Sequence, residues 1–105
     1  MYLQVEHLAQ IPRGLSLLDG MTTDVCGNVY VVVMSGRVWR VKPDGQTDLV
    51  SDLPGGILSV TPALNFGSGV GGWSRTSLYV TSFTGGVFEM DVGVEGRRDP
   101  HLPLP

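Results

Sequence analysis

The sequence has few of the residues that stabilise small disulfide-bonded or zinc-binding domains. Among its 105 residues there is a single cysteine, Cys26, and only 16% of residues are charged. One cysteine excludes an intrachain disulfide and any zinc site built from the cysteines of one chain. Cys26 lies in the turn-like segment Asp24–Asn28, where we expect a packed or half-exposed thiol rather than a nucleophile.

Long apolar runs and clusters of positive charge are also missing. No apolar stretch approaches the roughly 20 residues of a membrane helix, and the first residues lack the basic start of a signal peptide. The seven Lys and Arg residues are scattered in a chain of formal net charge −3, which argues against a nucleic-acid surface. We therefore expect a soluble, cytoplasmic protein that binds neither membranes nor nucleic acid.

Glycine, by contrast, is abundant, and the sequence repeats itself. The 15 glycines and 7 prolines are typical of short strands joined by tight turns, and no apolar stripe has the 3.6-residue period of a helix. Asn28–Val41 aligns without a gap on Ser77–Met90, at an offset of 49 residues. Each copy consists of a β-branched and aromatic segment, a glycine turn and a second such segment, which predicts two paired strands.

A second match lies upstream, at an offset of 42 residues. Leu8–Gly14 corresponds to Val50–Gly56, and the alignment continues until Asp24 meets Phe66. The two offsets differ by an insertion of seven residues in the glycine-rich run 67–72, where a loop can lengthen at low entropic cost. The repeating unit is thus four strands in about 40–50 residues, the size of a β-propeller blade.

The predicted fold is therefore all-β, with about two propeller blades in a strand order of one, four and three. Residues 1–12 hold an unpaired outer strand (Tyr2–Gln10), 15–54 the first blade, 57–94 three strands of the second, and 95–105 a polar, proline-rich tail that cannot pair well. The predicted strands of the two blades are Met21–Val25, Asn28–Met34, Arg37–Lys42 and Thr47–Leu53, then Thr61–Phe66, Ser77–Phe83 and Gly86–Val92.

Two blades leave two sheet faces bare. Val29–Met34 is apolar at every position, which predicts a strand covered on both faces. Propellers usually have 4–8 blades, so this chain must associate or belong to something longer. We expect a homo-oligomer, preferably a trimer with six blades, in which Tyr2–Gln10 completes the sheet that ends at Val92.

Several motifs resemble those of one propeller family. Leu18–Val31 reads LDGMTTDVCGNVYV, and it is followed by Gly36–Gly45, by Asn65–Gly67 and by Ser77–Ser82. Together they resemble the regucalcin/gluconolactonase family of six-bladed propellers, of which strictosidine-synthase-like proteins are relatives. The resemblance covers about residues 14–96 and corresponds to the last third of a full-length member.

This resemblance implies metal-dependent hydrolysis of lactones or esters, with a calcium-type ion at the inner end of the central tunnel. The aspartate of the Asp-Gly-Met motif is one metal ligand of the family, and here it is Asp19. The other family ligands, a glutamate and asparagines from other blades, have no counterpart in this chain. The alternative function is a non-catalytic, self-assembling propeller module that binds a small ligand or a protein.

Asp19 also has two interpretations from its own chemistry. A carboxylate at a strand entrance facing a tunnel suits a hard divalent cation, whereas a turn aspartate would bond the backbone ahead of Gly20. In a threefold ring three Asp19 carboxylates would converge, which requires a bound cation or a raised pKa. Thr61, its repeat partner, and nearby Asn65 are weaker candidates for oxygen ligands. Trp73, after the glycine-rich loop, is the candidate for lining a ligand cleft.

Overall fold

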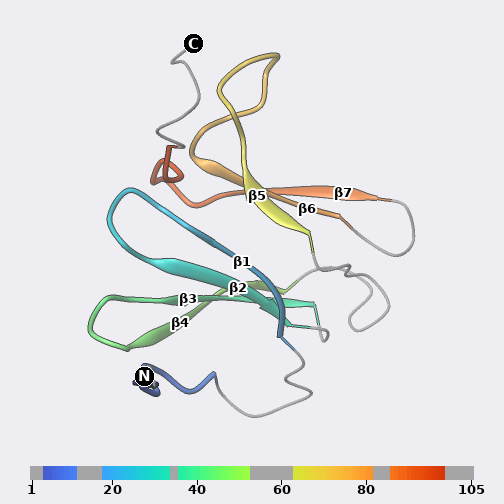
Figure 1. The fold of residues 1–105 in the computed structure, drawn as a ribbon. Coiled ribbons are helices and arrows are strands. Elements are labelled where there is room, and N and C mark those ends of the chain that lie inside the picture. Colours follow the sequence, from blue (N-terminus) through green and yellow to red (C-terminus); the bar gives the residue numbers. More distant parts are fainter. Residues whose placement is uncertain (1–3, 12–17, 34–35, 53–62, 82–85, 99–105) are drawn as a thin grey trace.

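The protein folds into two antiparallel sheets (Figure 1). The computed structural model describes residues 4–11, 18–33, 36–52, 63–81 and 86–98. Sheet one contains β1 (Leu18–Thr23), β2 (Val29–Val33), β3 (Arg37–Val41) and β4 (Thr47–Asp52), and sheet two contains β5 (Leu64–Phe66), β6 (Ser77–Thr81) and β7 (Val87–Asp91). Within each sheet the spatial order of the strands follows their order in the sequence.

The described strands confirm the all-β prediction, because each of the seven lies where the repeat predicted it. The first strand begins three residues earlier than predicted, at Leu18 instead of Met21, and β5 is shorter, beginning at Leu64. In the part of the chain that the structure describes, no helix is long and apolar enough to cross a membrane.

The hairpin turns follow from local chemistry. Gly27 and Gly45 have φ angles of 87° and 88°, a left-handed conformation that favours glycine and allows β1–β2 and β3–β4 to reverse direction. In the β3–β4 turn the Lys42 amide donates to the carbonyl of Gln46 at 2.8 Å, and the Gln46 amide donates to the Asp44 carboxylate at 2.9 Å. An aspartate in this position stabilises a tight turn.

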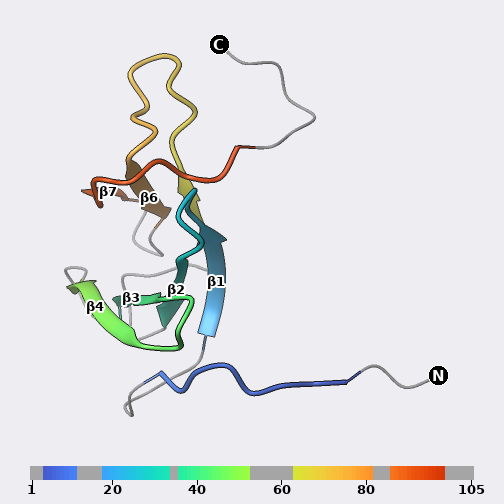
Figure 2. The same cartoon turned by 90° about the vertical axis from the view of Figure 1, so that its left-hand side faces the viewer.

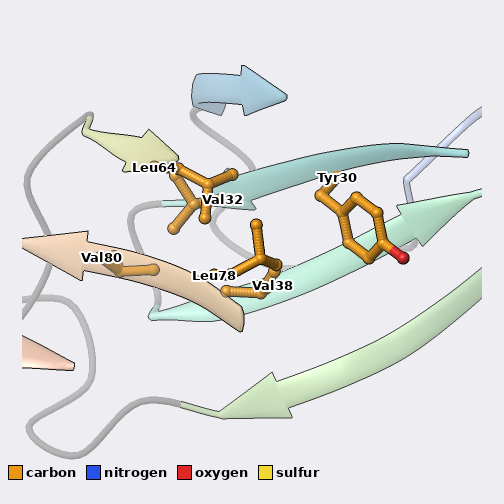
Figure 3. Close-up of a cluster of buried hydrophobic side chains, with 6 residues drawn as sticks. All are labelled: Tyr30, Val32, Val38, Leu64, Leu78 and Val80. Carbon is orange, nitrogen blue, oxygen red and sulfur yellow. The ribbon is translucent and has the colours of Figure 1, made fainter. Parts of the chain in front are cut away.

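The main core lies between the two sheets. Tyr30, Val32 and Val38 of sheet one meet Leu64, Leu78 and Val80 of sheet two, and all six side chains are buried (Figure 3). The rings of Tyr30 and Phe66 meet edge to face, with centroids 5.5 Å apart. Such a contact adds specificity to the apolar burial that holds the two sheets together.

A second, smaller cluster covers the other face of sheet one. Ile11 packs there with Val31 and Val33, which are 9% and 3% exposed. The alternate side chains of β2, Tyr30 and Val32, are fully buried on the opposite face. β2 is therefore covered on both sides, as its uninterrupted apolar sequence predicted.

The strand registers correct the sequence alignment of the first strands by one residue. Thr22 pairs with Tyr30 in sheet one, and Asn65 pairs with Tyr79 in sheet two. Since Tyr30 and Tyr79 are equivalent, Thr22 matches Asn65 at an offset of 43, so the predicted match of Asp24 with Phe66 was wrong. A slip of one residue moves a side chain to the other face of a strand, and Thr22 and Thr23 are too alike to fix the register from sequence.

The segment that follows β7 connects the two sheets at one end. The Val25 amide donates to the Glu95 carbonyl at 2.9 Å, the Arg97 amide to the Thr23 carbonyl at 3.0 Å, and the Gly96 amide to the Arg75 carbonyl at 3.0 Å. Residues 95–97 therefore do pair, contrary to the expectation for a polar tail. They do so through backbone groups, which composition does not report.

In the single chain, the described N-terminal residues do not form the predicted outer strand. Residues 4–11 contain no strand, and Val5 and Leu8 are 92% and 77% exposed. They lie on the side of sheet one away from β7 (Figures 1 and 2). The partner predicted for Tyr2–Gln10 was the sheet edge of another copy, so that pairing stays a prediction.

Candidate functional site

Asp19 lies at an irregularity of β1. Leu18 pairs with Val33 and Gly20 pairs with Val32, so Asp19 is the extra residue of a β-bulge. β1 is the edge strand of sheet one, and it contacts β5, the edge strand of sheet two (Figure 1). Bulges on edge strands redirect side chains and recur beside active sites. The inner edge formed by β1 and β5 is therefore the candidate site.

The structure locates only one of the two weaker candidate ligands. Thr61 lies outside the described residues. Asn65 lies in β5 with its side chain exposed. Its equivalent in sheet one is Thr22, three residues beyond Asp19, or roughly 10 Å along a strand at about 3.3 Å per residue. Asp19 and Asn65 thus share the inner edge but stand at different levels along it.

The oxygen donors at this edge fit a calcium-type ion in kind but not in number. Calcium takes about six to eight oxygen ligands, of which a carboxylate and an amide are typical. Among residues 4–11, 18–33, 36–52, 63–81 and 86–98, no group of three His, Cys, Asp or Glu side chains could hold a metal ion. Asp19 and Asn65 would therefore form only part of a coordination shell for such an ion, and backbone carbonyls, water or further side chains would have to complete it.

Trp73 lies at the other end of the sheets. It belongs to the β5–β6 loop, which follows the end of β5, whereas Asp19 is at the beginning of β1. Its ring meets that of Tyr79 edge to face, with centroids 5.0 Å apart, and the residue remains 52% exposed. The Tyr79 hydroxyl accepts from the Ser74 amide at 2.9 Å and donates to Glu89 at 2.7 Å. Trp73 is thus held on the outer side of sheet two, and the structure does not bring it to Asp19.

The most developed polar cluster in the described residues surrounds Asp24. The residue is 3% exposed, and its carboxylate accepts four hydrogen bonds. Oδ1 accepts from the amides of Cys26 and Asn28 at 2.9 and 3.0 Å. Oδ2 accepts from Asn28 Nδ2 at 2.9 Å and from the Tyr30 hydroxyl at 2.8 Å. This cluster fixes the β1–β2 turn and the position of Tyr30 in the core.

These contacts also determine how Asp24 ionises. Burial on its own would raise the pKa of the carboxyl, but the hydrogen bonds from Asn28, Tyr30 and Cys26 together hold that pKa below its usual value. Sequence reasoning treated the segment only as a turn around Cys26, which is an exposed free thiol. The signal was present, since an aspartate at a strand turn, with Gly27-Asn28 three residues further on, is typical of a side chain that bonds the backbone ahead of it.

The pKa of Tyr30 is shifted in the opposite direction to that of Asp24. Burial and the hydrogen bond to the Asp24 carboxylate raise the pKa of its hydroxyl to about 12, and Arg40, which pairs opposite it in the ladder, acts against this rise. Arg40 is held by Asp48, 2.9 Å from its Nη2. Tyrosinate would place a second negative charge next to Asp24, so the neutral form is favoured in the folded state.

We expect the protein to lose stability at alkaline pH through Tyr30. Its folded pKa is near 12 and its ordinary value is 10.0, so its contribution is complete below pH 10 and is lost as the pH rises towards 12. Denaturant unfolding between pH 9 and 12, values chosen to bracket this interval, should show a shallower decline for Tyr30→Phe than for the wild type. Tyr79→Phe is the comparison for a tyrosine outside the core; the hydrogen bond to Glu89 also raises the pKa of its hydroxyl, but this exposed group should flatten the decline less than Tyr30→Phe does. A decline that persists unchanged in Tyr30→Phe would contradict the assignment.

The sequence of these sheets matches a known family. Residues 3–84 match the family model described as the SMP-30/Gluconolactonase/LRE-like region. The chain belongs to this family. The match includes all of sheet one and reaches β6 of sheet two. Because the SMP-30/gluconolactonase/LRE-like proteins are β-propellers, the two sheets are propeller blades, and β1 and β5 are their innermost strands. Neither a search of curated proteins nor one of solved structures gave a match.

Proposed function

We propose that this chain is a blade pair of a metal-dependent hydrolase of small lactones or esters, in which Asp19 supplies one ligand to a divalent cation, calcium by preference. Membership of the SMP-30/gluconolactonase/LRE-like family supports the class of protein. The observation that carries the proposal is the β-bulge at Asp19 on the innermost strand of the first blade. The bulge inserts Asp19 as an extra residue while the rest of the β1–β2 ladder stays paired.

The chain's own residues would act by positioning. The Asp24 cluster fixes the β1–β2 turn, and β2 is packed on both faces, so the strand that carries Asp19 rests on a rigid neighbour. Asn65, on the inner edge of the second blade, is a candidate for a further oxygen ligand or for a hydrogen bond to a substrate oxygen. A bound cation in such a site would polarise a carbonyl group and lower the pKa of a water molecule.

A second function rests on the small number of ligands. The described residues do not assemble three metal-binding side chains, which favours a non-catalytic propeller module that assembles with further blades and binds a small ligand or a protein. In that case the half-exposed Trp73, anchored by Tyr79, is the residue we propose for contact with the ligand.

Calcium should raise the melting temperature of the protein, and Asp19→Asn should abolish that rise. Binding to the folded state alone stabilises it by about 2.7 kcal/mol when the ligand is at about 100 times its dissociation constant. The matched control is Asp44→Asn, which changes an exposed turn aspartate and should leave the calcium response unchanged. The measurement is differential scanning fluorimetry with calcium and with a chelator.

The same variants separate the two functions. Calcium-dependent hydrolysis of a small lactone that is lost in Asp19→Asn but kept in Asp44→Asn would support the hydrolase. A calcium response without hydrolysis would support the binding module. If melting curves with calcium and with chelator coincide for all three proteins, Asp19 is not a calcium ligand and the metal-dependent hydrolase is wrong, whereas the binding module remains.

A further inference from the structure

Two of the protein's cationic side chains differ from the others in having no acidic partner. Six of the seven Lys and Arg residues lie in the parts of the chain that the structure describes. Four of these six are within ion-pair distance of a carboxylate, namely Arg37, Arg40, Lys42 and Arg98. The other two, Arg75 and Arg97, form no ion pair with any described residue.

The fold brings these two arginines to the same end of the sheets. The Gly96 amide, next to Arg97, donates to the Arg75 carbonyl at 3.0 Å, so residues 95–98 run directly beside the β5–β6 loop. Figures 1 and 2 both show this segment between that loop and the β1–β2 turn. Because Arg98 follows Arg97, three arginines that are scattered in the sequence share one end of the protein.

The side chains beside Gly96 are directed away from the core. Gly96 forms an antiparallel bridge with Asp24, and a Cβ atom on Gly96 would point into the ring of Phe66. Side chains alternate along such an extended segment, so those of Glu95 and Arg97 point to the opposite side. Arg97 is exposed, in agreement with this geometry.

Arg75 lies across the glycine-rich part of the β5–β6 loop. A Cβ atom on Gly69 would come within 3.0 Å of Arg75 Cγ, and nearer still to its Nε. The loop is closed at this point by the Gly69 amide, which donates to the Trp73 carbonyl at 2.7 Å. The Arg75 side chain is thus confined against the loop, and a confined side chain loses less conformational freedom when it binds a ligand.

Acidic side chains do not balance the arginines at this end. The β5–β6 loop contains no acidic residue, and residues 92–98 contain only Glu95, 3.8 Å from Arg98. Asp24 is buried, and Asp91, at the end of β7, accepts a hydrogen bond from the turn that follows it. With three arginines and one glutamate, the loop and the segment are positively charged in a chain of formal net charge −3.

Exposed apolar side chains border the arginines. Trp73 and Val70 are 52% and 56% exposed in the same loop as Arg75. Val25, 56% exposed, donates its backbone amide to the Glu95 carbonyl at 2.9 Å. Arginine and tryptophan are enriched where proteins bind each other, and exposed apolar groups beside a charged cluster fit a protein segment better than a free anion.

We propose that this end of the protein binds an acidic segment of a partner protein. Arg75 and Arg97 bind its carboxylates, which a planar guanidinium can hold through two parallel hydrogen bonds, and Trp73 and Val25 contact its apolar side chains. The surface lies at the ends of the strands, so blades packed on the faces of the two sheets leave it accessible. It is also independent of the proposed cation, because Asp19 lies at the other end of β1.

The test is the affinity for a fluorescein-labelled peptide of Glu-Glu-Leu repeats, measured by fluorescence anisotropy. Arg75→Gln and Arg97→Gln should each raise its dissociation constant about three- to fivefold, and the double variant about tenfold or more, as expected for exposed ion pairs. Trp73→Ala should weaken binding through the lost apolar contact. Arg37→Gln is the matched control, because it removes an exposed cation at the opposite end of the sheets and should leave the affinity unchanged. Circular dichroism checks that each variant is folded.

Salt and competing anions complete the test. Raising the salt concentration from about 0.05 M to about 0.5 M should release the peptide, since salt screens exposed charges. Asp19→Asn should bind like the wild type, so a failure of the metal site leaves this proposal standing. It would be overturned by no binding, by equal binding of a Gln-Gln-Leu peptide, or by an equal loss in Arg37→Gln. Tighter binding to phosphatidylserine vesicles or to single-stranded DNA would also overturn it, and would assign the surface to a membrane or a nucleic acid.

Discussion

Replacing Asp24 with asparagine should lower the free energy of unfolding by about 3 kcal/mol at neutral pH, because hydrogen bonds to a charged group contribute about 1.5–3 kcal/mol each. The buried carboxylate accepts four of them. In Asp24→Asn an NH2 group replaces one carboxylate oxygen and faces hydrogen-bond donors in either orientation. In place of Oδ1 it meets the backbone amides of Cys26 and Asn28. In place of Oδ2 it meets Asn28 Nδ2 and the Tyr30 hydroxyl. At least one donor would then be left unsatisfied inside the protein.

The pH dependence identifies the charge as the cause. The folded pKa of Asp24 lies below its ordinary value of 3.8, so its contribution is complete above about pH 4 and is lost as the pH falls through the folded pKa. Urea unfolding from neutral to acidic pH should show this acid loss in the wild type and a smaller one in Asp24→Asn. Asp44→Asn, at an exposed turn, should retain the wild-type acid profile. An Asp24→Asn profile parallel to that of the wild type would show that the cluster does not depend on ionisation.

The contact between the blades should be equally sensitive at Gly96. A Cβ atom added there would overlap the ring of Phe66, with Cδ2 only 2.6 Å away, and Phe66 already packs against Tyr30. Gly96→Ala should therefore lower the free energy of unfolding by about 2–3 kcal/mol, near the upper end of overpacking effects. Gly86→Ala is the control, because its Cβ would meet the Phe88 ring at an ordinary 3.8 Å and should change stability by less than about 0.5 kcal/mol.

A second substitution tests the steric explanation for Gly96. Phe66→Ala removes Cγ and Cδ2, two of the atoms that the new methyl group would overlap, so the double variant should lose less stability than the sum of the two single variants. Denaturant unfolding of the four proteins gives the coupling energy directly. Additive losses would show that Gly96→Ala acts on the backbone of residues 95–97 and not on Phe66.

The parts of the fold that sequence predicted are those set by local pattern. β2, β3 and β6 could be located because β-branched and aromatic residues alternate around glycine turns, and their repetition at a fixed offset confirmed the pairing. The register between Thr22 and Asn65 was missed by one residue, since β1 and β5 carry no aromatic residue at matching positions. The pairing of Gly96 with Asp24 was missed because backbone hydrogen bonds between distant segments leave no trace in composition.

The candidate site was predictable to a similar extent. The resemblance to a family motif selected Asp19, but the bulge that contains it depends on how the whole β1–β2 ladder is hydrogen-bonded, which one strand's sequence does not specify. Trp73 was selected by its place after a glycine-rich loop, yet the direction of that loop decides which end of the blades it reaches. The Asp24 cluster escaped notice because burial, and not the turn itself, makes its hydrogen bonds important.

The connection formed by residues 95–97 has a consequence for the order of folding. The strands of each blade pair with their sequence neighbours, whereas the bond from the Val25 amide to the Glu95 carbonyl joins residues 70 positions apart. During synthesis from the N-terminus, the strands of both sheets can leave the ribosome before residue 95 does. Each blade can thus form early from short-range contacts, and the apolar contact between the blades can form before residues 95–97 add their backbone hydrogen bonds.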